Sequence, residues 1–103
     1  MVLARMSIWN FKKGKRDEGF AELDRILNTS TRHTSGFRGY ISLLSKENSN
    51  MATILTLWQD EESLKASEAG VFSNAIDSAR KFLESGPQVE NFRVFSTELF
   101  QRQ

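Results

Sequence analysis

The sequence predicts an α+β fold in which one four-stranded antiparallel sheet carries two helices on one side. Short stretches of alternating or continuous apolar residues predict the strands. Two longer stretches, in which apolar residues recur every three or four positions, predict amphipathic helices. The order along the chain is strand, helix, strand, strand, helix, strand, which is the ferredoxin-like βαββαβ pattern. We expect residues 1–103 to form a single domain, because a chain of this length supports one hydrophobic core.

The first two elements are a strand and an amphipathic helix. Residues 2–9 alternate between two faces, as a strand does. One face is wholly apolar and the other is mixed: Val2, Ala4, Met6 and Ile8 against Leu3, Arg5, Ser7 and Trp9. From about residue 15 to residue 32 an apolar stripe has helical spacing, at Phe20, Leu23, Ile26 and Leu27. We expect this helix to end near Gly36, which adopts a left-handed cap at little cost.

The next two strands are predicted to form a hairpin. Residues 36–45 run Gly36-Phe-Arg-Gly-Tyr-Ile-Ser-Leu-Leu-Ser45, which is typical of a strand. Residues 51–58, Met51-Ala-Thr-Ile-Leu-Thr-Leu-Trp58, are also strand-like and apolar on both faces. The segment between them, Glu47-Asn-Ser-Asn50, has the polar composition of a turn. The two strands are therefore expected to be antiparallel neighbours.

A second helix and a last strand complete the pattern. Asp60 is a favoured N-cap residue, and Glu61 and Glu62 follow in the first turn, where the helix dipole favours negative charge. Gly70 is expected to divide this helix into two pieces. The second piece ends at Ser85-Gly-Pro87, because proline cannot continue a helix. Residues 89–100 are predicted to form the last strand.

Composition excludes several classes of function. Fourteen basic and thirteen acidic residues give a net charge of +1, too little to attract nucleic acid or an anionic membrane. The absence of cysteine excludes disulfides and thiolate chemistry, and a single histidine among scattered carboxylates lacks metal-ligand spacing. No apolar run is long enough to span a membrane. We expect a cytoplasmic protein that binds no metal, nucleic acid or membrane.

The third and last strands are apolar on both faces, although two helices can cover only one face of a four-stranded sheet. In the third strand Ile54 and Trp58 share one face, and Leu55 and Leu57 share the other. Burying each large apolar side chain is worth roughly 1.5–3 kcal/mol, and an exposed patch of this extent marks an interface. We predict a homodimer whose sheets pack face to face through Leu55 and Leu57. Ile54 and Trp58 are expected to meet the helices or a cavity beneath them.

Several segments within this framework carry a resemblance to a family. They are Gly36-Phe-Arg-Gly-Tyr40, Ile54-Leu-Thr-Leu-Trp58, Ser63-Leu64 and Val71-Phe72 with Ala75. Through them the chain resembles the antibiotic biosynthesis monooxygenase family over nearly its whole length, which implies a dimeric α+β barrel. The family's chemistry is varied. Its members include cofactor-independent oxygenases of aromatic polyketides, heme-degrading oxygenases, quinol-type oxygenases and enzymes that process signal molecules.

The resemblance argues against the heme-degrading branch. That branch uses an asparagine in the first strand, a tryptophan at the end of the third strand and a histidine iron ligand on the second helix. Trp58 matches the tryptophan. The same alignment places Met6 or Ser7 at the asparagine and Ile76 at the histidine, and isoleucine cannot bind iron. No cofactor is therefore expected.

Four residues are candidates for catalysis. Trp58 is expected to line a cavity, or to anchor the second helix in the core. His33 is the only histidine and a candidate general base, the alternative being a surface or capping role. Arg38 and Tyr40 lie two positions apart in a strand and are expected to share a face, where they can stabilise a phenolate or enolate. The alternative for Arg38 is a solvent-facing charge at the edge of a strand, with no part in catalysis.

A substrate pocket is expected beside Trp58. Its candidate lining residues are Phe20, Phe37, Phe72, Asn74 and Ile76. At helical spacing Phe72 is also typical of a core residue. The leading hypothesis is a cofactor-independent monooxygenase-like enzyme that oxidises a small aromatic or quinol substrate, because a deprotonated phenol reacts with dioxygen once it is oriented and shielded from water. The alternatives are a non-catalytic dimeric small-molecule binding or stress-associated protein, and a heme-handling protein.

Overall fold

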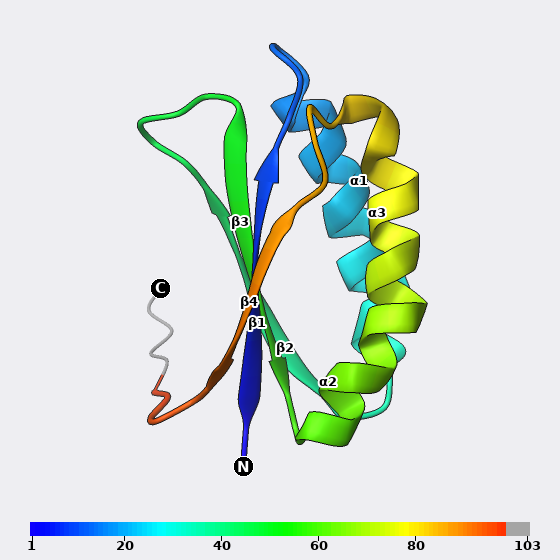
Figure 1. Cartoon of the computed structure of the whole chain (residues 1–103), viewed down its shortest axis with the longest axis vertical. Coiled ribbons are helices and arrows are strands. Elements are labelled where there is room, and N and C mark those ends of the chain that lie inside the picture. Colours follow the sequence, from blue (N-terminus) through cyan, green and yellow to red (C-terminus); the bar gives the residue numbers. More distant parts are fainter. Residues whose placement is uncertain (99–103) are drawn as a thin grey trace, which may run out of the picture.

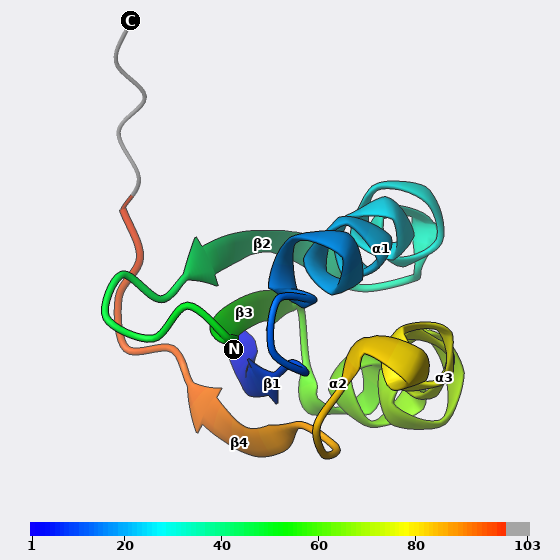
Figure 2. The same ribbon diagram turned by 90° about the horizontal axis from the view of Figure 1, so that it is seen from above.

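The computed structural model describes residues 1–98 as a four-stranded antiparallel sheet with helices packed on one face (Figure 1). The strands are β1 (Leu3–Asn10), β2 (Phe37–Leu44), β3 (Met51–Trp58) and β4 (Gln88–Arg93), in the order β2-β3-β1-β4. The helices are α1 (Arg16–Thr29), α2 (Glu61–Ser67) and α3 (Ser73–Ala79), with short turns at Thr31–His33 (η1), Glu68–Phe72 (η2) and Arg80–Phe82 (η3). Figure 2 shows the two layers from above. The predicted ferredoxin-like α+β fold is confirmed.

The sheet register brings one end of the three longest strands together at Trp58. Trp58 pairs with Leu3 of β1 on one side and with Phe37 of β2 on the other. The β2–β3 hairpin is antiparallel, as predicted. Arg16, the first residue of α1, contacts its loop, where Nη1 donates a hydrogen bond to the Ser45 carbonyl at 3.0 Å. Trp58 therefore lies at the centre of the sheet end nearest α2.

A β-bulge in β2 changes which side chains face the helices. Phe37 pairs with Trp58, but Gly39 rather than Arg38 pairs with Leu57, and Gly39 has a φ of +144°, a region that favours glycine. Phe37 and Tyr40, three positions apart, therefore both pack on the helix side, with their rings stacked 6.3 Å apart. The expectation that Arg38 and Tyr40 share a face was wrong, because the extra residue shifts the alternation by one.

The last strand is shorter than the predicted segment 89–100. β4 pairs with β1 from Gln88, opposite Ile8, to Arg93, opposite Leu3. β1 begins at Leu3, so the ladder ends there, and a single further hydrogen bond runs from Val94 N to Val2 O at 2.9 Å. The prediction also included residues 99 and 100, which lie outside the described residues.

The second helical segment begins and breaks where the sequence predicts. The Asp60 carboxylate accepts a hydrogen bond from Ser63 N at 2.8 Å, and this bond is the main cause that lowers the pKa of Asp60 below its usual value. At Gly70 the backbone is not helical, with φ −105° and ψ −107°, and η2 forms a π-type turn. Kinks at glycine and π-turns are a recognised way to re-aim a helix. Here the kink separates α2 from α3.

The helices bury one face of the sheet in two apolar clusters. The smaller cluster is built from Leu3, Trp58 and Leu64. The larger cluster consists of Trp9, Phe11, Leu23, Leu27, Ala52, Ile54, Ala79 and Leu83. Between the two clusters on β1 lie Arg5 and Ser7, which are also buried. The covered face is therefore the mixed face of the first strand.

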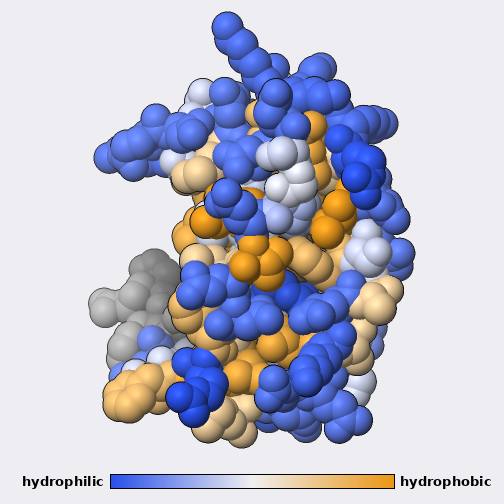
Figure 3. All heavy atoms as spheres, viewed as in Figure 1, coloured by the Kyte–Doolittle hydropathy of each residue, from blue (hydrophilic) through white to orange (hydrophobic). Residues whose placement is uncertain are grey.

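The opposite face of the sheet is apolar and carries no helix among residues 1–98. Leu55 and Leu57 lie on this open face, and Ile54 and Trp58 lie on the covered face, as the alternation predicts. The strand pairings place nine apolar residues on the open face: Ala4, Met6, Ile8, Ile41, Leu43, Met51, Leu55, Leu57 and Phe92. Figure 3 views the sheet from its β4 edge and shows hydrophobic atoms along the side of the sheet opposite the helices.

We expect Gly19, inside α1, to resist enlargement. A β-carbon there would lie 2.5 Å from Phe11 Cε1 and 2.9 Å from Phe82 Cβ. Alanine is favoured over glycine in a helix by roughly 0.5–1 kcal/mol, but overpacking costs about 1–3 kcal/mol. Gly19→Ala should therefore lower the free energy of unfolding by about 1–2 kcal/mol in urea titrations.

The matched control is Gly86→Ala, where a new β-carbon meets nothing within 4 Å. It should change the free energy of unfolding by less than about 0.5 kcal/mol. A Gly19→Ala protein more stable than the wild type would show that Phe11 and Phe82 move aside freely.

Candidate functional site

A small cavity lies between the covered face of the sheet and the helices, next to Trp58. Its volume is about 30 Å³, enough for a water molecule but not for an aromatic ring. The strands contribute Arg5, Ser7, Trp9, Ile54, Thr56 and Trp58 to its wall. The helices and turns contribute Leu23, Ile26, Leu27, Thr31, Val71, Phe72 and Ala75. The wall is thus apolar and aromatic, with a short polar stripe along β1 and β3.

Two tryptophan–hydroxyl pairs form much of this polar stripe. Trp58, which is fully buried, donates from Nε1 to Thr56 Oγ1 at 2.9 Å. Trp9 donates in the same way to Ser7 Oγ at 2.8 Å. In each pair the two residues are two positions apart, so they share a strand face. Both indole N–H groups are therefore satisfied within the wall.

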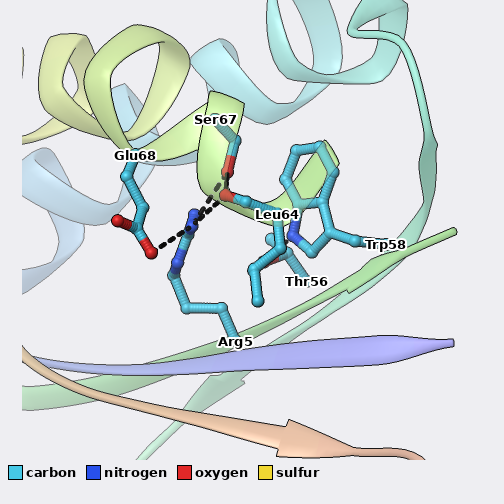
Figure 4. A network of polar contacts seen from close by, with 6 residues as sticks. All are labelled: Arg5, Thr56, Trp58, Leu64, Ser67 and Glu68. Carbon is cyan, nitrogen blue, oxygen red and sulfur yellow. Dashed lines mark hydrogen bonds and ion pairs between the residues drawn. The ribbon is translucent and has the colours of Figure 1, made fainter. Parts of the chain in front are cut away.

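Arg5 is the charged residue of the cavity (Figure 4). It rises from β1 to the end of α2, where Nη2 donates to Leu64 O at 2.9 Å and to Ser67 Oγ at 2.8 Å. Nη2 also lies 3.9 Å from the Glu68 carboxylate. The guanidinium carbon is 4.6 Å from the centre of the Phe72 ring, within the range of a cation–π contact. Arg5 therefore links the sheet to the segment that carries the kink.

The Arg5 side chain is a positive charge in a largely dry site. Arg5 is 2% exposed, and this burial lowers its pKa, an effect that the nearby Glu68 carboxylate partly opposes. Arginine nevertheless stays protonated in proteins. The Glu68 side chain is 52% exposed, so solvent screens its attraction for the guanidinium. Preorganised positive charge in such a site stabilises anions more strongly than it does in water.

Of the predicted pocket residues, the structure brings Trp58 and Phe72 to the cavity. Phe37 lies behind Trp58, with its ring edge-on at 5.3 Å, and Phe20 packs against Phe11 with ring centres 6.5 Å apart. Ile76 is half-buried against the larger cluster, and Asn74 is exposed on α3. Phe20, Phe37, Asn74 and Ile76 therefore lie outside the cavity wall.

The other predicted catalytic residues do not line the cavity. His33 is exposed in η1, and Arg38 is exposed in the β-bulge. Tyr40 turns toward α1, where its hydroxyl donates to Asn28 Oδ1 at 3.1 Å. None of the three belongs to the residues that line the cavity. The structure thus assembles the site around Arg5 instead.

Sequence reasoning missed the polar stripe of Arg5, Ser7 and Thr56. A signal for it was present, because Arg5 shares a strand face with Leu3 and Trp9, two residues that favour burial. A charged residue at the centre of such a face is a candidate for a buried, hydrogen-bonded charge with a structural or functional role. Of the two residues aligned with the asparagine, Ser7 lines the cavity and Met6 lies on the open face.

The side chains around the cavity do not fit an axial ligand set for heme iron. Such ligands are histidine, cysteine, methionine or tyrosine, whereas the polar side chains of the wall are Arg5, Ser7, Thr31, Thr56 and the two indoles. Within residues 1–98 no group of three or more His, Cys, Asp or Glu residues is placed to hold a metal ion.

None of the helices in this part of the chain is long and apolar enough to cross a membrane.

The sequence comparison decides the family. Residues 1–84, from the start of the chain through η3, match the model of the antibiotic biosynthesis monooxygenase family. The chain belongs to this family. No curated protein matches the sequence. The family match ends before β4, so the assignment rests on β1 to η3, the part that builds the cavity of this monooxygenase-family protein.

Solved structures share the fold of this monooxygenase-family chain at low sequence identity. SnoaB, a cofactor-independent oxygenase from Streptomyces nogalater, is 13% identical, with a TM-score of 0.77 over 93% of this chain and 95% of its own. A Nitrosomonas europaea protein of unknown function is 19% identical, with a TM-score of 0.78 over 98% and 96%. A conserved Methanosarcina mazei protein is also 19% identical, with a TM-score of 0.77 over 90% and 92%. At these identities the likeness establishes the fold alone.

Proposed function

We propose that the protein is a cofactor-independent monooxygenase-like enzyme that oxidises a small aromatic or quinol substrate beside Trp58. The observation that carries the proposal is a buried guanidinium, Arg5, in a cavity otherwise walled by aromatic and aliphatic side chains. Membership of the monooxygenase family supports it, as does the shared fold with SnoaB, described as a cofactor-independent oxygenase.

The proposed chemistry uses the electrons of the substrate itself. A deprotonated hydroquinone is electron-rich and reacts with dioxygen to give the anion of a hydroxyquinone and water, with one oxygen atom of dioxygen in each product. The protein has to orient the ring, stabilise its anion and exclude water. Trp58 and Phe72 supply flat apolar walls for the ring, and Arg5 supplies the positive charge.

Substrate entry requires the cavity to widen, because about 30 Å³ is less than an aromatic ring occupies. We place this widening at η2, where the backbone departs from helical geometry at Gly70 and the next two residues, Val71 and Phe72, line the cavity. Both side chains are only half-buried. Outward movement of this segment exposes Arg5 and Trp58 without disturbing the sheet.

The test is oxygen uptake with a panel of hydroquinones, with quinone formation followed by absorbance and anaerobic incubations as blanks. Phe72→Ala and Phe20→Ala form a matched pair, since both phenylalanines are half-buried and only Phe72 lines the cavity. We expect kcat/KM to fall about tenfold or more for Phe72→Ala, and to change little for Phe20→Ala. Ligands that raise thermal stability without any oxygen uptake would instead support a non-catalytic binding protein.

We also propose that the open face of the sheet is covered by a second copy of the chain. Nine apolar residues lie on it, and Leu43 and Phe92 remain 47% and 40% exposed. A patch of this kind on a protein of balanced charge favours association through apolar contact rather than electrostatic steering. A homodimer with the two sheets face to face leaves each cavity on the outer, helix side.

A further inference from the structure

One buried donor of Arg5, a residue of the cavity wall, is left without a hydrogen-bond partner. Nη2 is used by Leu64 O and Ser67 Oγ, but the buried Nε–H has no hydrogen-bond partner among the described residues. A buried donor that lacks an acceptor destabilises the protein, because it has lost its hydrogen bonds to water without gaining a replacement. A ligand oxygen that accepts from this side of the guanidinium recovers that loss.

Apart from the half-exposed Glu68 carboxylate, which does not line the cavity, the described residues around Arg5 offer no base that could take a proton from a ligand. Its neighbours on β1, β3 and α2 are Ser7, Thr56, Trp58, Leu64 and Ser67, which carry no group that ionises near neutral pH. Opposite Arg5 on β4 is an amide, Asn91. From η2 the charged group that faces Arg5 is Glu68, which is half-exposed and lies against the guanidinium itself.

We propose that the cavity takes its ligand as a preformed oxyanion, a phenolate or enolate, held by Arg5, and that the proton leaves to solvent before the ligand enters. This inference rests on the proposed role of the cavity as the substrate site. The O–H bond breaks outside the protein, and water or buffer receives the proton. The cavity then binds acidic phenols and enols in preference to less acidic ones. A neutral hydroxyl that enters keeps its proton, because no residue of the cavity wall can accept it.

The test measures binding of inert phenols to the intact protein by calorimetry across neutral pH. The probes are 4-nitrophenol, the less acidic 4-cyanophenol, and 4-nitroanisole, which matches nitrophenol in shape but cannot ionise. We expect each phenol to bind at least about tenfold more tightly above its own ionisation pH than below it. The transition should occur at a higher pH for cyanophenol, and the weaker binding of nitroanisole should not depend on pH.

Two results would overturn the inference. One is equal affinity for the neutral and ionised forms. The other is a transition at the same pH for both phenols, which would mean that a protein group titrates instead. These probes are not substrates for oxidation, so their binding is judged separately from oxygen uptake by hydroquinones, and either proposal can fail alone.

Variants at Arg5 separate charge from structure. Arg5→Met should abolish the pH dependence of phenol binding, while its affinity for nitroanisole stays within about threefold of the wild-type value. Arg5→Lys should keep part of the pH dependence. A purely structural role for Arg5 predicts that Arg5→Met weakens all three ligands equally. If Arg5→Met does not fold, the ligand series on the wild-type protein still decides the question.

Discussion

Replacing Trp58 by alanine is expected to lower the free energy of unfolding by about 3–5 kcal/mol, the usual cost of truncating a fully buried tryptophan. Trp58 is 0% exposed and forms the smaller cluster with Leu3 and Leu64. Its ring also meets Phe37 edge-on at 5.3 Å. Truncation opens a void at the point where β1, β2 and β3 meet α2, and removes the donor that Trp58 provides to Thr56. Urea unfolding followed by circular dichroism measures the loss.

Two further variants test the cause of this loss. Trp58→Phe keeps most of the ring and removes the hydrogen bond to Thr56, so we expect a smaller loss of about 1–2 kcal/mol. Phe95→Ala, at a residue that is fully exposed, should cost less than about 0.5 kcal/mol. If Trp58→Ala costs no more than Trp58→Phe, the cavity wall at Trp58 is not the rigid anchor that its burial indicates.

Leu55→Asp is expected to dissociate the proposed homodimer. Leu55 lies on the open face between Met6 of β1 and Ile41 of β2, so in a face-to-face pair the new carboxylate would be buried opposite apolar side chains. Burying an unpaired charge costs several kcal/mol, and each dimer would contain two. Sedimentation equilibrium at micromolar concentration should show the mass of two chains for the wild type and of one chain for the variant.

The matched control is Val89→Asp. Val89 is also an apolar strand residue, 45% exposed, but it pairs with Ser7 and so shares the helix side of the sheet. This variant should keep the mass of two chains. A wild-type protein that sediments as one chain at micromolar concentration, or a Leu55→Asp variant that remains paired, would refute the dimer.

Local patterns in the sequence were sufficient to predict most of the fold. The strand Met51–Trp58 was predicted to the residue, because polar turn residues and a strong N-cap flank it. The kink at Gly70 followed from the residue type alone. The length of β4 could not be predicted from local sequence, since it depends on where the neighbouring strand β1 begins. The bulge at Arg38 also escaped prediction, because a one-residue insertion leaves the alternation on each side of it intact.

The site was harder to predict than the fold for a physical reason. Arg5 is buried because two acceptors, Leu64 O and Ser67 Oγ, meet it from a helix about sixty residues later in the chain. A charged residue in a strand is expected at the surface until such partners are known. Trp58 and Phe72, two of the candidates from the sequence, line the cavity, whereas His33, Arg38 and Tyr40 were chosen for their chemistry and do not line it.

The tryptophan–hydroxyl pairs have an optical consequence. The chain contains two tryptophans, and both line the cavity, so essentially all of its intrinsic fluorescence originates from the wall of one site. Indole emission responds to the polarity of its surroundings and to electron-accepting rings in contact with it. Ring-shaped ligands entering between Trp58 and Phe72, and any opening of η2 that admits water, should therefore change the colour or intensity of this emission, whereas events on the open face should leave it nearly unchanged.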